Sequence, residues 1–222
     1  MIEAIYEPAA KRRHIQYPES DGKPLAETDI HVLEIVSLLE VLREYFKDDA
    51  DVYVAGNNFI YFQDGDIAKR VSPDVYVVFG VEKKLRRTFK TWIEQAVPAV
   101  VFEVSSRKTR REDTEKKWHI YAALGVKEYF LYDPEDDYLK PPLQGHRLVR
   151  GFYHRIKPDK DGFLLSKELG MKFRLEQGLI QLYDIQTGKR LMRAAEVRNQ
   201  VSQAEQELAR LREELARLKH RG

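Results

Sequence analysis

Two carboxylates and one lysine occur along this chain in an order that can support metal-dependent hydrolysis. Asp74 follows Pro73 at the start of an apolar segment, Glu103 lies near the end of the apolar segment 100–104, and Lys117 follows on a predicted helix. Carboxylates on neighbouring strands can hold a divalent cation, and a nearby ammonium can steady a water molecule or a leaving phosphate oxygen. These three residues are therefore the smallest set of groups that could hydrolyse a phosphodiester bond.

The apolar surroundings of the two acids favour a functional role. Asp74 opens the run 75–79 and Glu103 follows the run 99–102, and such runs are typical of buried central strands. A carboxylate there is costly to desolvate unless something compensates it, and a bound cation is a common compensation. For either acid alone, a strand-end cap or a pair with an arginine is the alternative. The order of both acids ahead of Lys117 favours a site.

Several spaced motifs resemble the Uma-type restriction-endonuclease family, within the PD-(D/E)XK nuclease superfamily. They span roughly residues 20 to 185 and are Pro73-Asp74, Glu103-Val104-Ser105-Ser106 with Thr109, Asp113, Lys117, Tyr121-Ala122-Ala123-Leu124-Gly125-Val126 and Glu128-Tyr129-Phe130-Leu131-Tyr132-Asp133-Pro134. The match is specific because the elements recur in order. The superfamily motif has a lysine two positions after the glutamate, where this chain has Ser105. The Uma-type pattern resembles a migrated version, in which the following helix supplies the lysine, and Lys117 matches it.

The resemblance implies a role for each residue of the site. It implies Asp74, Glu103 and Lys117 as catalytic residues, and Asp74, Glu103 and the Val104 carbonyl as metal ligands. The implied cofactor is Mg²⁺, for which Mn²⁺ can substitute, and oxygen ligands in a chain without cysteine suit such hard cations. The implied activity is hydrolysis of DNA phosphodiester bonds by a metal-dependent endonuclease, with DNA as the partner.

The predicted elements agree with the fold that the resemblance implies. In chain order they are a helix from Ile30 to about Phe46, β-rich pieces at 52–54 and 59–62, the Asp74 strand 75–79, the Glu103 strand 100–104, a helix from about Arg111 to Leu124 stopped by Gly125, and the strand 128–132. The pieces before the Asp74 strand suggest a meander. We expect an α/β fold with a restriction-endonuclease-like mixed β-sheet, α-β-β-β-α-β, flanked by helices. Short strands after residue 142 are expected to extend the sheet.

His31 and Glu34 lie about one turn apart on the first predicted helix and should face similar directions. An acid on this helix often assists the metal in the superfamily, so the resemblance makes Glu34 a candidate. A plain surface glutamate and a structural histidine are the interpretations that we favour for the two residues.

Composition indicates one sizeable globular domain with an appendage. The chain has 222 residues, of which 43% are hydrophobic and 33% are charged. The absence of cysteine excludes disulfides and thiolate metal sites and favours a reducing compartment. The first residues lack a basic region followed by an apolar stretch, and no apolar run approaches the ~20 residues of a membrane span. We therefore expect a cytoplasmic protein that does not bind a membrane.

Charge is balanced over the whole chain but uneven near the proposed site. The net charge is only +2, whereas residues 82–90 hold five basic side chains against one acid, and residues 107–117 hold six against three. Both segments follow a strand that carries a site residue, so they could line a groove for DNA phosphates. Solvated loops with lysines kept outside for solubility are the alternative.

The C-terminal segment follows a different pattern from the rest of the chain. Its apolar residues follow a 4-3 spacing, typical of a coiled-coil seam: Val197, Val201, Ala204, Leu208, Leu211, Leu215 and Leu218. We divide the chain into an irregular N-terminal arm at 1–24, a restriction-endonuclease-like domain at 25–188 and a C-terminal coiled-coil helix at 189–222. Self-association, most simply as a homodimer, is expected through this helix; an amphipathic helix folded back on the domain is the alternative.

Two functions of different classes fit these features. The first is an active metal-dependent endonuclease. The second is a coiled-coil scaffold or nucleic-acid-binding module that keeps the fold without turnover, since Ser105 stands where the superfamily has lysine. The presence of Lys117 on the face shared with Asp113 and Tyr121 favours the enzyme, because a degenerate site has no need for an ammonium there.

Overall fold

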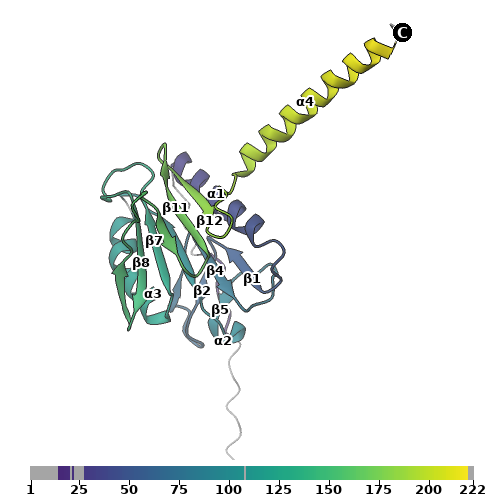
Figure 1. Cartoon of the computed structure of the whole chain (residues 1–222). Coiled ribbons are helices and arrows are strands. Elements are labelled where there is room, and N and C mark those ends of the chain that lie inside the picture. Colours follow the sequence, from purple (N-terminus) through teal and green to yellow (C-terminus); the bar gives the residue numbers. More distant parts are fainter. Residues whose placement is uncertain (1–14, 21, 23–27, 108, 220–222) are drawn as a thin grey trace, which may run out of the picture.

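A computed structural model describes residues 15–20, 22, 28–107 and 109–219 (Figure 1). Most of the predicted N-terminal arm, 1–24, lies outside these residues. The part that is described has no regular secondary structure, but Tyr17 packs edge-on against Tyr61 and bonds Asp64 at 2.8 Å. The predicted domain division stays a prediction.

A six-stranded mixed sheet forms the centre of the domain. Its strands, in spatial order, are β1 (Val52–Ala55), β4 (Val75–Phe79), β6 (Val100–Val104), β7 (Glu128–Tyr132), β8 (Leu143–Val149) and β9 (Phe152–Arg155). Only β6 and β7 are parallel; the other neighbours are antiparallel. The parallel pair is joined by a helical crossover, as parallel strands require.

Layers of helix and sheet cover both faces of the central sheet. One face carries α1 (Asp29–Tyr45) and a three-stranded sheet of β10 (Leu164–Ser166), β11 (Met171–Glu176) and β12 (Leu179–Asp184). The other face carries α3 (Lys117–Leu124) and a small sheet of β2 (Ile60–Tyr61), β3 (Arg70–Val71) and β5 (Phe89–Lys90), which leads into the short α2 (Thr91–Glu94). The central strands are therefore buried on both sides, as their continuous apolar sequences predict.

Strand alternation divides the hydrophobic core between the two faces. On β4, Val75 and Val77 join the core under α1, whereas Tyr76 and Val78 join the core under α3. This alternation also decides on which face each site residue of β4 and β6 can lie.

The restriction-endonuclease-like fold predicted from the sequence is confirmed, with two corrections. The α-β-β-β-α-β core consists of α1, β1, β4, β6, α3 and β7. The predicted meander is wrong, because β1 pairs directly with β4 and β2 pairs with β3 and β5 in a separate sheet. After residue 142, β8 and β9 extend the central sheet as expected, but β10 to β12 form a sheet of their own.

The predicted helix 111–124 has two parts. A π-helical turn, η1 (Glu112–Lys116), precedes α3, and Gly125 ends α3 with a φ of 83°, as its sequence position predicts. Single π turns occur often at functional sites, where they reset the angle at which a helix presents its side chains.

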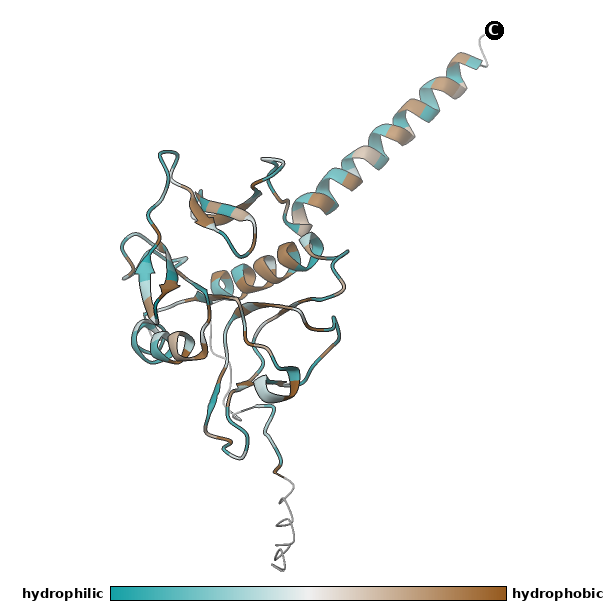
Figure 2. Ribbon diagram, turned by 60° about the horizontal axis from the view of Figure 1, so that its bottom comes forward, coloured by the Kyte–Doolittle hydropathy of each residue, from teal (hydrophilic) through white to brown (hydrophobic). Residues whose placement is uncertain are grey.

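The C-terminal helix α4 (Ala194–Lys219) projects away from the domain (Figure 1), and none of its 26 residues is buried. Apolar residues recur along it between polar ones (Figure 2). The helix is thus confirmed, while its pairing stays a prediction. Within the described part of the chain, no helix is both long enough and apolar enough to cross a membrane.

Candidate active site

Asp74 and Glu103 lie side by side on the central sheet. Val75 of β4 pairs with Phe102 of β6, so the same antiparallel register places Asp74 opposite Glu103. Side-chain alternation puts both carboxylates on the face covered by α3. The Val104 N–H donates to Asp74 Oδ2 at 2.8 Å, and the carbonyl of the same strand residue points to the same side.

Helix α3 supplies two partners for Glu103. Lys117 Nζ lies 2.8 Å from Glu103 Oε2, and the Tyr121 hydroxyl donates to Oε1 at 2.6 Å. Their spacing of four residues places both side chains on one face of the helix. The structure therefore brings together all three residues predicted as catalytic, and Tyr121 holds the orientation of Glu103.

A third carboxylate, Asp113, belongs to the same cluster and was not among the predicted site residues. Its Oδ1 lies 3.0 Å from Lys117 Nζ, and its Oδ2 accepts a 2.5 Å hydrogen bond from Ser105. Ser105 also bonds the Tyr138 hydroxyl. The residue at the usual lysine position thus positions Asp113, and the four-residue spacing of Asp113 and Lys117 was the sequence signal for this contact.

The two candidate residues on α1, His31 and Glu34, have different partners in the structure. His31 is buried and its Nε2 lies 3.9 Å from Asp74 Oδ2, at the edge of the cluster. Glu34 is also buried, so its interpretation as a plain surface residue is wrong; its carboxylate pairs with Arg193 at 2.6 Å. A glutamate that neutralises an arginine on the α1 side of the sheet does not face Asp74.

The cluster of Asp74, Glu103, Asp113 and Lys117 is shielded from solvent except at two of these side chains. The side chains of Asp74 and Lys117 are 14% and 12% exposed, whereas those of Glu103 and Asp113 are almost fully buried. The cluster is therefore accessible from the surface at Asp74 and Lys117, and Glu103 lies behind them.

Three carboxylates share one ammonium in this cluster, and the imbalance appears in the pKa values. Burial raises the pKa of Glu103 well above its usual range; Lys117 opposes the rise, and Asp74 and Asp113 add to it. The pKa of Asp74 is raised by burial in the same way. Burial acts to lower the pKa of Lys117, but the carboxylates outweigh it and raise that pKa, so Lys117 remains an ammonium.

A family model described as "Uma2: Putative restriction endonuclease" matches residues 5–178. The chain belongs to this family. The family inferred from the spaced motifs is thereby confirmed. A solved structure, described as "a putative nuclease belonging to DUF820 from Anabaena variabilis ATCC 29413", is 15% identical with a TM-score of 0.49, over 66% of this chain and 76% of that one. No curated protein matches the sequence.

The donor set of this Uma2 family member is suited to a hard divalent cation. Asp74 and Glu103 offer carboxylate oxygens and Val104 a carbonyl, and the surplus of negative charge is of the kind that a cation compensates. Lys117 and Tyr121 occupy both oxygens of Glu103. The described residues include no group of three or more His, Cys, Asp or Glu that could hold a metal ion by themselves.

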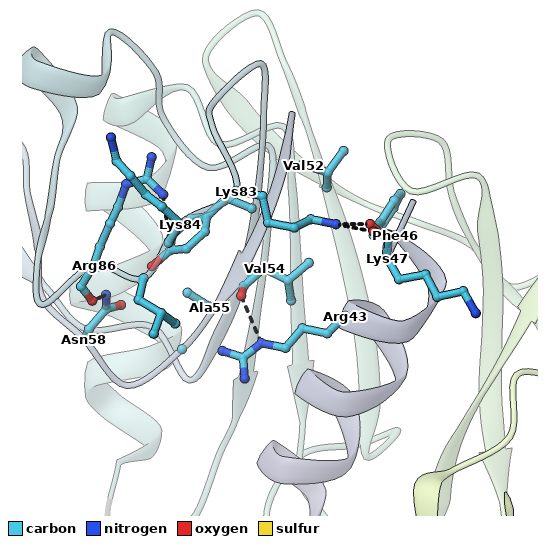
Figure 3. Close-up of a pocket in the computed structure, with 13 residues that line it drawn as sticks. Arg43, Phe46, Lys47, Val52, Val54, Ala55, Asn58, Lys83, Lys84 and Arg86 are labelled. Atoms are coloured by element: carbon cyan, nitrogen blue, oxygen red, sulfur yellow. Dashed lines mark hydrogen bonds between the residues drawn. The ribbon is translucent and has the colours of Figure 1, made fainter. Parts of the chain in front are cut away.

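A basic pocket lies along β1, the edge strand next to the strand that follows Asp74. Its volume is about 620 Å³, and five basic residues contribute to its lining: Arg43, Lys47, Lys83, Lys84 and Arg86. Figure 3 shows Arg43 bonded to the Val54 carbonyl and Lys83 bonded to the backbone of Phe46 and Lys47. In contrast, Arg86 and Lys84 pair with Glu94 and Glu82. Part of the basic segment 82–90 thus lines a concave surface, while the groove predicted for phosphates stays a prediction.

Proposed function

We propose that this Uma2 family member is a Mg²⁺-dependent endonuclease that hydrolyses DNA phosphodiester bonds, with Mn²⁺ able to replace Mg²⁺. The observation that carries the proposal is the position of Lys117, whose ammonium lies 2.8 Å from Glu103 and 3.0 Å from Asp113 at the open end of the cluster. The Lys117 side chain is 12% exposed beside Asp74, which supports a contact with substrate in addition to its pairing with the buried acids.

Asp74, Glu103 and the Val104 carbonyl are the groups that would hold the metal ion. When bound, the ion supplies Lewis-acid stabilisation of phosphate charge and lowers the pKa of a bound water. The surplus of carboxylates over ammonium in the cluster supports this assignment, since a bound cation would offset both the burial that mainly raises the pKa of Glu103 and the repulsion from Asp74 and Asp113 that adds to it.

The chain's own residues orient the reaction. Tyr121 fixes Glu103 through a 2.6 Å hydrogen bond, and Ser105 fixes Asp113 through one of 2.5 Å. Lys117 is held as an ammonium between these two carboxylates, so it can donate hydrogen bonds to a water or a phosphate oxygen but cannot accept a proton. Its role would be to offset negative charge that develops in the transition state.

DNA phosphates would contact the basic surfaces on either side of the cluster. Arg43 and Lys83 donate to backbone carbonyls in the pocket along β1, so carboxylates do not cancel their charge there. Arg107 and Arg110, from the second basic segment, lie two and five residues after Ser105; Arg107 is exposed and lies 3.6 Å from Asp137. Such contacts supply affinity that weakens with salt, and they carry no sequence information.

Nicking of supercoiled plasmid by the purified chain, in Mg²⁺ or Mn²⁺ and in EDTA, tests the proposal. The wild type should nick with either ion and stop in EDTA, and Glu103→Gln should be inactive with both ions. Glu168→Gln is a matched control, since Glu168 pairs with Lys127 through a largely exposed contact on another part of the surface. DNA binding without nicking under all conditions would instead support the non-catalytic binding module.

A further inference from the structure

The exposed face of α4 has no partner within the described chain. The apolar residues of its seam are all exposed, from 40% at Val197 to 61% at Leu218, although such residues are usually buried. At ~1.5 Å per residue, the 26-residue helix is about 39 Å long. The helix does not fold back on the domain: it projects away from it (Figure 1), and none of its residues is buried.

The spacing of the seam assigns each residue a heptad position. The a positions are Val201, Leu208 and Leu215, and the d positions are Val197, Ala204, Leu211 and Leu218. The flanking e positions then include Glu205, Arg212 and Lys219, and the flanking g positions include Gln200, Glu207 and Glu214. Charges at e and g set the partner and the direction of a coiled coil.

We propose that α4 forms a parallel two-stranded coiled coil with α4 of a second copy of this chain. In a parallel pair, each g residue meets the e residue five positions later on the other helix. Glu207 then meets the partner's Arg212, and Glu214 meets the partner's Lys219, each twice by symmetry. The remaining g residue, Gln200, is neutral and meets the partner's Glu205.

The reverse direction places like charges together. In an antiparallel pair, g residues face g residues, so Glu207 faces either the partner's Glu207 or the partner's Glu214, depending on register. Among the e residues, Arg198 faces the partner's Arg212 or the partner's Lys219, and only the second register adds a favourable pair, Glu205 with the partner's Arg212. Within one chain, Glu207 makes only a long ion pair with Arg210, 3.8 Å on an exposed surface, which leaves it available to a second helix.

A parallel coil places both domains at the same end. Residue Arg193, which precedes α4, is tied to buried Glu34 by contacts of 2.6 and 3.1 Å, so each domain is fixed at the start of its own helix. Two copies of the Asp74 and Glu103 cluster would then lie near one another, available to one DNA molecule. This last step rests on the proposed nuclease function; the direction of the coil does not.

Disulfide cross-linking of the full chain tests the direction, because the sequence contains no cysteine. Oxidised Leu218→Cys should give a covalent dimer, since identical d residues face each other only in a parallel pair. In antiparallel registers these cysteines lie roughly 25 Å or more apart. A mixture of Leu218→Cys and Val201→Cys chains should give no mixed disulfide. A mixed disulfide without the Leu218→Cys homodimer, or a monomeric wild type in light scattering, would overturn the proposal.

A charge exchange tests the pairing without cysteine. Glu214→Lys at a g position should weaken the dimer about tenfold by sedimentation, and an equimolar mixture with Lys219→Glu should restore association. Glu213→Lys is the matched control, since Glu213 directly precedes Glu214 but lies at an f position, outside the seam, and its substitution should change the affinity little. Equal weakening by both substitutions, or no recovery in the mixture, would count against parallel pairing. None of these measurements depends on DNA or metal. The coiled-coil proposal can therefore be refuted while the nuclease proposal stands, and the nuclease proposal can be refuted while the coiled-coil proposal stands.

Discussion

A Cβ atom on Gly56 would lie only 1.9 Å from the backbone carbonyl oxygen of Asp74. Gly56 directly follows β1, and the next residue, Asn57, donates its N–H to Pro73 at 2.9 Å. Absence of a side chain at this position therefore lets the chain approach closely enough to fix the residue that begins the site. Such close approach is one of the structural uses of glycine in and beside strands.

Gly56→Ala should push Asp74 away from Glu103 and lower plasmid nicking strongly, with a stability loss of about 1–3 kcal/mol from overpacking. Chemical unfolding and nicking rates measure the two effects. Gly65→Ala is the control, because Gly65 has open space around it but a φ of +87° that also disfavours alanine. It should lose stability and keep its nicking rate. Normal activity of Gly56→Ala would show that the close approach does not position the site.

Lys117→Ala should reduce the rate of nicking by roughly 10²-fold or more, because charge stabilisation in the transition state is worth about 3 kcal/mol. It should also lower the free energy of unfolding by about 3–5 kcal/mol, since Glu103 and Asp113 would remain buried without a counterion. Rates are best measured well below the unfolding temperature of the variant, and at fixed salt.

Lys116→Ala is the control for this substitution. The Lys116 side chain is 71% exposed and lies 3.8 Å from Glu112, away from the cluster. It should change the nicking rate and the stability little. If both variants lost activity equally, or if Lys117→Ala weakened only DNA binding, Lys117 would be a phosphate contact and its catalytic assignment would be wrong.

Two truncations should separate association from folding. A chain ending at residue 196 keeps Arg190, Arg193 and Glu196 and should be a stable monomer. A chain ending at residue 189 loses Arg193, whose partner Glu34 has a side chain only 1% exposed, and should be less stable by about 3–5 kcal/mol. Light scattering gives the mass and thermal unfolding gives the stability. Equal stability of the two chains would mean that Arg193 does not anchor the C-terminal segment.

Stability should fall on mild acidification because of His146. Burial, with help from Arg155, lowers the pKa of His146 from 6.5 to about 4. Between these pH values the unfolded chain binds a proton that the folded chain does not, so the free energy of unfolding decreases as pH falls, by up to about 3 kcal/mol. Urea unfolding at pH 7 and pH 4.5 should show a smaller loss for His146→Phe, and exposed His154→Phe should behave like the wild type.

The sequence was sufficient for the elements whose patterns are local. Continuous apolar runs identified β4, β6 and β7, and periodicity identified α1 and α4. The order of Asp74, Glu103 and Lys117 led to a cluster that the structure assembles on one face of the sheet. Their catalytic role stays a prediction.

Long-range pairing was what local patterns could not supply. The segments of β1 and β2 look alike in sequence. However, β1 pairs with β4 at the edge of the central sheet, whereas β2 pairs with β3 in a separate small sheet. Glu34 looked like a surface residue because its partner, Arg193, lies 159 residues away. The π turn that leads into α3, in which Asp113 is the buried residue, is not visible in helix periodicity.

Helix α1 contacts both the candidate site and the segment that precedes α4. One turn of this helix carries His31, 3.9 Å from Asp74 at the rim of the cluster, and Glu34, which holds the residue next to the start of α4. In a dimer formed through α4 as proposed above, a tilt of the paired helices would act on Glu34 through Arg193 and, on the same turn of α1, on His31 beside Asp74.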